Sequence, residues 1–362
     1  MWRQQDMPAP AAGAVERSEV PLICFTVFAP AAAGASLFAL PLGGGWALAA
    51  IVVLMVTAGM LASIAHLARP LRAPRSLAHL GSSWLSREIL VVSAFWTLAV
   101  LWLLCELGGA GMFGGAVGAA ASSGAAGEPA IEAFAAGSGA AGAAEGAAAA
   151  AVFPWAAVTC GFHVAAVVIG AVLLWVIARA YRVHGQPAWD GSDAFWELVA
   201  GALGSGGTVA AAVAAGQGIA MGGTFCPGSI FGCCSAATLG LVAILAISAA
   251  CLVMGFAHRR RAVRIAALAE MEGGPRARAA CDELAKGGTE PRAYPILESL
   301  AGVCALAALA AALLLDENAA GDALAAVALA FCAIFELAAQ ASIRNRFYSL
   351  AQHARYVAVS RR

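Results

Sequence analysis

Five polar residues lie close together in the chain, between the end of one long apolar segment and the start of the next. His66 ends the first segment and Glu88 begins the second; the polar stretch between them holds Arg72, Ser83 and Ser86. Histidine titrates near neutral pH and can hydrogen-bond a hydroquinone hydroxyl. A carboxyl group at the edge of an apolar environment retains its proton more readily and can then pass it to water. We therefore interpret His66 and Glu88 as a proton-handling pair. The alternative is that both are ordinary polar side chains that extend to water from helix ends.

The elements that must position this pair are membrane-spanning helices. The chain of 362 residues is 62% hydrophobic and 12% charged, with a mean hydropathy of +0.82, whereas soluble domains carry about 25% charged residues. About 20 apolar residues in a helix cross a bilayer. Eight segments meet this requirement, at roughly 21–42, 46–68, 88–112, 151–178, 194–216, 232–257, 295–315 and 321–345. The sequence therefore predicts an all-α integral membrane protein with eight transmembrane helices in a bundle.

The spans divide the chain into alternating membrane and extramembrane parts. We expect an N-terminal segment 1–20, helices one to three in 21–112 with the candidate site loop 67–87, a Gly/Ala-rich loop 113–150, helices four to six in 151–257, a basic loop 258–294, helices seven and eight in 295–345, and a basic tail 346–362. Residues 41–45 make a short turn between the first two spans. Small residues such as Gly201, Ser205, Gly206 and Gly207 suit close helix packing in lipid.

The positive charges indicate how the bundle is oriented. All 21 Lys and Arg residues fall in the termini or in loops on the same side as the termini. The opposite loops carry only acidic charges: Glu128, Glu132, Glu145, Asp316, Glu317 and Asp322. Because basic loops stay in the cytoplasm, we expect both termini and the 67–87 loop to be cytoplasmic. The net charge is zero, and nothing in the chain indicates a nucleic-acid partner.

Two further ionisable residues lie within predicted spans, where their desolvation is costly. His163 and Glu336 could each make a hydrogen bond between helices, or they could line a proton path in a secondary transporter or channel. A di-haem cytochrome needs four histidines within its spans, so we expect no haem. None of the ten cysteines forms a C-x-x-C pair, so we expect no metal and no iron–sulfur cluster in this chain. Whether Cys226, Cys233 and Cys234 form a disulfide is left open.

Several pieces, in order along the chain, resemble the membrane-anchor subunit of the anaerobic dimethyl sulfoxide reductase family. They are residues 19–28 at the start of the first span, residues 62–73 with His66 and Arg72, then Ser76-Leu77, Ser83-x-x-Ser86-x-Glu88, Arg179-x-Tyr181 with Pro187-x-Trp189, and Arg344-x-x-Phe347-Tyr348. The stretch from His66 to Glu88 is the most specific of these. The sequence departs from the family pattern at Val20, Pro30 and Gln340.

The resemblance implies a three-part respiratory complex in the bacterial cytoplasmic membrane. A molybdopterin subunit would reduce the terminal acceptor, a ferredoxin-like iron–sulfur subunit would carry electrons, and this chain would bind and oxidise menaquinol, an exchangeable substrate, without acting on the acceptor itself. The family pattern places catalysis at His66 and Glu88 and quinol binding at these two residues, Arg72, Ser83 and Ser86. The departures leave a second possibility, a purely structural anchor in contact with lipid and its partner subunits.

Overall fold

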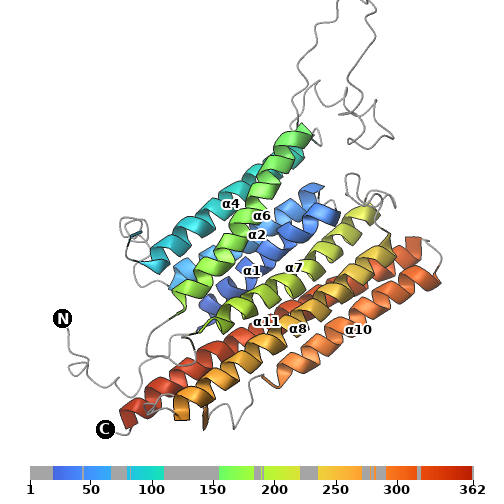
Figure 1. The fold of residues 1–362 in the computed structure, drawn as a ribbon. Helices are drawn as coiled ribbons and strands as arrows, with labels where there is room; N and C mark the ends of the chain where they lie inside the picture. The colour runs from blue at the N-terminus through green and yellow to red at the C-terminus, as the bar shows by residue number, and fades with distance from the viewer. Residues whose placement is uncertain are drawn as a thin grey trace, which may run out of the picture.

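The fold is a bundle of long helices that run nearly side by side (Figure 1). The computed structural model describes residues 19–42, 45–66, 80–81, 83–109, 155–182, 189, 191–220, 235–270, 278, 281–282, 291–315 and 319–360; of His66, Trp155 and residues 350–360 it describes the backbone only. The principal helices are α1 (Val20–Leu42), α2 (Gly45–His66), α4 (Trp84–Gly109), α6 (Trp155–Ala180), α7 (Asp193–Ala220), α8 (Ala236–Glu270), α10 (Ala293–Leu314) and α11 (Ala319–Ser360).

All eight of these helices are long and apolar enough to cross a membrane. Large apolar side chains are exposed on the outside of the bundle, among them Leu252, Leu313 and Leu245. Exposed leucines along entire helices are typical of surfaces that face lipid tails rather than water. The predicted all-α, eight-span membrane fold is therefore confirmed.

The helices form two groups of four that meet along α1 and α7. In the first group, α1 packs on α2 and α6, and α4 packs on α2 and α6; in the second, α7 and α10 pack on α8 and α11. Figure 1 shows the two groups side by side, with α7 next to α1. Because α7 contacts helices of both groups, it is the most deeply buried span, and its polar residues lie in the interior.

Glycines allow α1 and α7 to approach closely. A Cβ atom added at Gly206 would lie 2.5 Å from the backbone of Gly34. This agrees with the predicted use of small residues for packing in lipid. In the turn between α1 and α2, Gly45 has a φ of +48°, which a residue with a side chain rarely adopts. Gly45 thus begins α2 in a backbone conformation that favours glycine.

Two helices extend beyond their predicted spans. Helix α8 runs to Glu270 and α11 runs to Ser360, although the predicted spans end at 257 and 345. The basic residues Arg259–Arg264 are thus helical, and the basic loop and the basic tail both begin as helix. The predicted Gly/Ala-rich loop 113–150 and Cys226, Cys233 and Cys234 lie outside the described residues.

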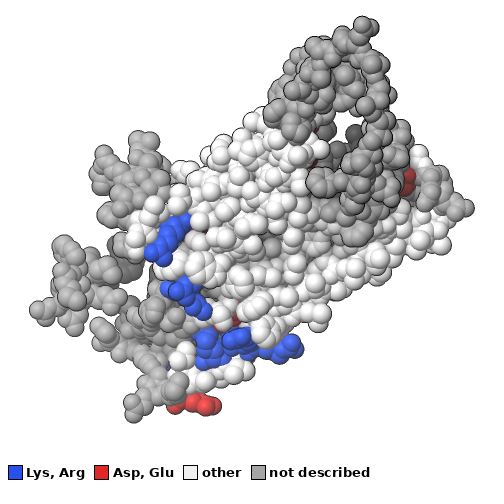
Figure 2. Space-filling view, turned by 45° about the horizontal axis from the view of Figure 1, so that its top comes forward, with Lys and Arg blue, Asp and Glu red and all other residues white. Residues whose placement is uncertain are grey.

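The basic side chains gather at one end of the bundle. Figure 2 shows the described Lys and Arg side chains on the visible face at the end where α8 and α11 finish. Helices α1, α4, α7 and α10 begin at this end, and α2, α6, α8 and α11 finish there, as an even number of spans requires. We refer to it as the basic end.

Candidate functional site

Glu88 lies in the first two turns of α4, at the basic end. The side chain is 6% exposed, and Ser86 next to it is buried as well. Ser83 precedes the helix, and its Oγ accepts a hydrogen bond from the backbone N–H of Ser86 at 3.4 Å, as a helix N-cap does. The structure thus gives Ser83 a role in helix capping and leaves Glu88 as the ionisable group of this turn.

Arginine and tryptophan side chains fix the start of α4. The Arg87 guanidinium donates hydrogen bonds to the backbone oxygens of Leu80 at 2.8 Å and Gly81 at 2.9 Å, and it lies 4.4 Å from the centre of the Trp84 ring. Arg179, at the end of α6, lies 5.0 Å from the same ring. These contacts hold the first turn of α4, and with it Glu88, against the end of α6.

Two of the predicted site residues lie outside this geometry. His66 is the last residue of α2 and its side chain is not described; Arg72 lies outside the described residues. The structure therefore places the backbone of His66 at the same end of the bundle as Glu88. Direct pairing of the two side chains stays a prediction.

The neighbours of Glu88 are two tyrosines from distant parts of the chain. The Tyr348 hydroxyl, on α11, donates a hydrogen bond of 2.9 Å to the hydroxyl of Tyr181, which follows α6. Burial of its side chain raises the pKa of Tyr181 well above its ordinary value, and the nearby Tyr348 and Glu88 add to this effect. Tyr181 is therefore a neutral hydrogen-bonding group and not a proton acceptor near neutral pH.

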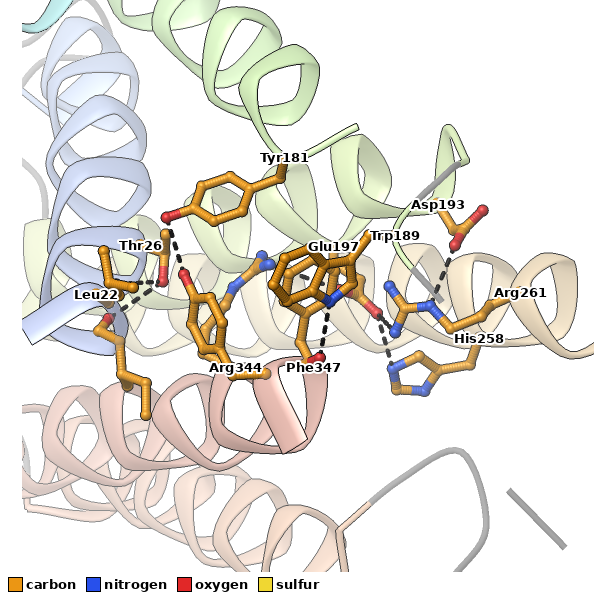
Figure 3. Close-up of polar contacts among 12 residues, drawn as sticks. Leu22, Thr26, Tyr181, Trp189, Asp193, Glu197, His258, Arg261, Arg344 and Phe347 are labelled. Carbon is orange, nitrogen blue, oxygen red and sulfur yellow. Dashed lines mark hydrogen bonds and ion pairs between the residues drawn. The ribbon is translucent and has the colours of Figure 1, made fainter. Parts of the chain in front are cut away.

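An aromatic cluster made of Tyr181, Trp189, Phe347 and Tyr348 lies on the side of α11. The Trp189 indole N–H donates to the backbone oxygen of Phe347 at 3.0 Å, and the two rings are stacked with centroids 5.4 Å apart. A small cavity of about 10 Å³ lies beside the cluster, enough for roughly one water molecule. Its lining includes the polar groups Thr26, Tyr181, Tyr348 and Arg344. Residues from three separate motifs of the sequence therefore meet at one place (Figure 3).

A buried ionic network continues from Arg344 to the surface. Glu197 of α7 is fully buried, and its carboxylate contacts Arg261 of α8, Arg344 of α11 at 3.5 Å and His258 at 3.5 Å. Figure 3 shows these side chains converging on Glu197. The pairing offsets part of the large cost of removing such charges from water. The network therefore ties three helices of the second group together at the basic end.

Asp193, one turn before Glu197 on α7, extends the network outward. Its carboxylate accepts hydrogen bonds from Arg261 at 3.1 Å and from Arg264 at 2.8 Å. These arginines fall in the predicted basic loop 258–294, and the network was not predicted. The residue spacing did indicate two charged helix faces. Asp193 and Glu197 are four residues apart, and His258, Arg261 and Arg264 follow at intervals of three. Each set therefore lies on one face of its helix.

The two ionisable residues expected inside spans both make contacts between or within helices. His163 Nε2 lies 2.8 Å from the backbone oxygen of Ser36, and its ring stacks on Trp102 at 4.0 Å. Glu336 accepts a hydrogen bond from Gln340 at 3.0 Å. His163 thus makes the predicted hydrogen bond between helices, here joining α6 to α1.

Residues 15–110 match the sequence profile of the family described as DMSO reductase anchor subunit (DmsC). The match covers about a quarter of the chain, from the start of α1 to the end of α4. It includes His66, Arg72, Ser83, Ser86 and Glu88, and it confirms the family resemblance over this stretch. No curated protein matches the chain at a significant level.

Proposed function

We propose that this chain is the membrane-anchor subunit of a dimethyl-sulfoxide-reductase-type complex and that it oxidises menaquinol at its basic end. The anchor role is supported by the family match over residues 15–110 together with eight membrane-spanning helices. The partners in this proposal are a ferredoxin-like iron–sulfur subunit and a molybdopterin catalytic subunit, and the membrane is the bacterial cytoplasmic membrane.

The observation that carries the quinol site is the position of Glu88. This carboxyl group lies in the matched stretch, is buried at the basic end, and adjoins the hydrogen-bonded pair Tyr181–Tyr348. A buried carboxyl group near two tyrosine hydroxyls is suited to accept a proton from a bound hydroquinone. His66, at the end of the neighbouring helix α2, is the second proton acceptor in this proposal.

Oxidation of a quinol to a quinone releases two protons and two electrons. In our proposal His66 accepts a hydrogen bond and then a proton from one hydroxyl, and Glu88 accepts the proton of the other. Tyr181 remains neutral and takes up no proton. Both protons leave to water at the basic end, and the two electrons pass one at a time to the iron–sulfur partner.

The partners dock at the basic end in this proposal, and that end faces the cytoplasm. The gathering of Lys and Arg there supports both statements, because basic segments remain in the cytoplasm. A site at this end also gives the shortest path for electrons from the quinol to a partner bound to the same surface. Arg259, Arg260 and Arg264 at the end of α8 are candidates for its rim.

The proposal is tested in the assembled complex with Glu88→Gln and His66→Ala. Glu88→Gln keeps the shape of the side chain but removes its ability to accept a proton. Quinol-driven turnover should therefore fall by about 10²- to 10⁴-fold, the usual range for a lost general base. Turnover with an artificial donor that reduces the partner subunits directly should be unchanged. Quinol-driven turnover at wild-type rates in both variants would rule out the site.

The matched control is Glu106→Gln. Glu106 lies on the same helix at the opposite end and accepts a hydrogen bond from Trp102 at 3.1 Å, so its replacement should leave quinol turnover intact. The alternative, a structural anchor without quinol chemistry, predicts assembled complexes in which wild type and both site variants fail alike with quinol.

A further inference from the structure

A second group of buried carboxyls lies within the membrane part of the bundle, in the helix group opposite to α4. Glu336 of α11 is fully buried, and Glu298 of α10 is 8% exposed. Both helices span the membrane. The desolvation of a charged side chain in such a place is costly. Carboxyl groups retained here therefore require a specific stabilising arrangement.

The two carboxyl groups contact each other, and the polar groups around them are donors. The Glu298 carboxyl is hydrogen-bonded to that of Glu336. Gln340 donates its amide N–H to Glu336 at 3.0 Å, and Cys251 of α8 donates its S–H to Glu298 at 2.9 Å. A hydrogen bond between two carboxyl groups requires a proton on one of them, because an ionised carboxylate only accepts.

An unsatisfied oxygen atom points to the same conclusion. Oε2 of Glu336 is buried and receives no hydrogen bond from the other described side chains. An ionised carboxylate would leave this atom with an uncompensated share of the charge, whereas a carboxylic acid would not. The thiol group of Cys332 is buried one turn before Glu336 on α11. No described arginine or lysine is among the groups that act on Glu336.

Helix α7 is shaped to leave room for the pair. A Cβ atom added at Gly204 would overlap Oε1 of Glu336, and one added at Gly201 would lie 3.2 Å from the amide oxygen of Gln340. A glycine inside a helix is less favourable than an alanine. Two glycines that face these two side chains indicate that the space they leave is used by the carboxyl pair.

A line of polar side chains leads from the pair toward the basic end. Glu336, Gln340 and Arg344 follow at intervals of four on one face of α11, and Arg344 contacts Glu197 of the ionic network. Glu336 lies about 12 Å along the helix axis from Arg344. The pair is therefore well inside the membrane part of the bundle and is connected by polar groups to one aqueous face.

We propose that Glu298 and Glu336 form a proton-binding site that holds one proton between them and exchanges it with the basic end. The ligand is a proton rather than a metal cation, because the amide N–H and the S–H around the pair direct hydrogen atoms at the carboxyls, where a cation would require oxygen ligands. The site lies in a different helix group from Glu88 and does not depend on the proposed quinol chemistry.

The site is tested by infrared spectroscopy of the full chain in lipid vesicles without quinol. The wild type should show the C=O band of a protonated carboxyl at neutral pH. Each of Glu298→Gln and Glu336→Gln should shift this band, because the hydrogen-bond partner changes, and the double variant should lose its contribution. Glu106→Gln, the matched control, should leave that contribution in place.

Three results would contradict the proposed proton-binding site. A wild-type chain without any protonated-carboxyl band at neutral pH overturns the proposal, even if the variants do not fold. A band that is identical in wild type and the folded double variant also overturns it. If sodium ions remove the band at constant pH, the site binds a cation instead of a proton. None of these results affects the quinol proposal, since the assay contains no quinol.

Discussion

Glu197 shows how a single buried charge organises the basic end. It has no exposed surface and its carboxylate faces Arg261, Arg344 and His258, which come from two other helices. A charge so placed is stabilised only by its partners, and each partner in turn depends on it. The network therefore fixes how α7, α8 and α11 meet, next to the aromatic cluster that adjoins Glu88.

Replacement of Glu197 by Gln should destabilise the chain by about 3–5 kcal/mol, because it leaves buried arginine charges without their partner. The measurement is the free energy of unfolding in detergent, compared with that of Glu270→Gln. Glu270 is exposed at the end of α8, so its replacement should change stability little. Equal effects in the two variants would show that the Glu197 network does not stabilise the fold.

Tyr181 gives a prediction for alkaline pH. Burial raises its pKa in the folded chain above the unfolded value of about 10, so the folded state holds the hydroxyl proton more tightly than the unfolded state. Its contribution to stability is complete below about pH 10 and is lost as the pH rises further. Tyr181→Phe should therefore show a smaller loss of thermal midpoint between about pH 9 and pH 11 than wild type. A parallel decline in both would contradict the shifted pKa.

At the scale of helices, the close approach of α1 and α7 joins the two halves of the bundle. Gly206→Ala should destabilise the chain by about 1–3 kcal/mol, since the added methyl group meets the backbone of Gly34. Gly216→Ala on the same helix is the matched control, because a Cβ there meets no atom within 4 Å. Thermal denaturation of the two variants distinguishes them. If Gly206→Ala is as stable as Gly216→Ala, the helices do not pack through Gly34 and Gly206.

The helices themselves could be predicted from the sequence, because runs of about 20 apolar residues and the one-sided basic charges are local signals. The position at which α8 ends could not be predicted from the sequence. A basic run marks where an apolar stretch leaves the membrane, but residues 262–270 continue to favour helix, and Arg261 and Arg264 bind Asp193 on another helix. The spacing of these residues indicates charged helix faces, but it does not show which residues about 70 positions apart pair with each other.

The candidate site could be predicted only in part, because local sequence signals identify single residues but not their contacts. Glu88 could be identified from its place at the start of a span, and the tyrosines from their resemblance to family motifs. That the Tyr348 hydroxyl on α11 contacts the Tyr181 hydroxyl, just after α6, follows only from the tertiary fold. The carboxyl pair of Glu298 and Glu336 likewise needs two helices in contact. Glu336 alone gave no indication of its partner.

At the scale of the whole molecule, the orientation in the membrane is open to direct test. A fluorescent protein fused to the C terminus should fold and fluoresce, because we expect that end to be cytoplasmic. Alkaline phosphatase inserted between residues 113 and 150 should be active, because we expect this segment on the opposite side. The reverse pattern would place the basic end, and with it the proposed quinol site, outside the cytoplasm.

The most direct test of the central claim is a quinol titration of the complex purified through this chain. We expect an iron–sulfur subunit and a molybdenum-containing subunit to co-purify, and a menaquinol analogue to reduce the iron–sulfur clusters in wild type but not in Glu88→Gln, as followed by electron paramagnetic resonance. Purification of this chain without partner subunits would contradict the account. Equal reduction of the clusters in wild type and Glu88→Gln would also contradict it.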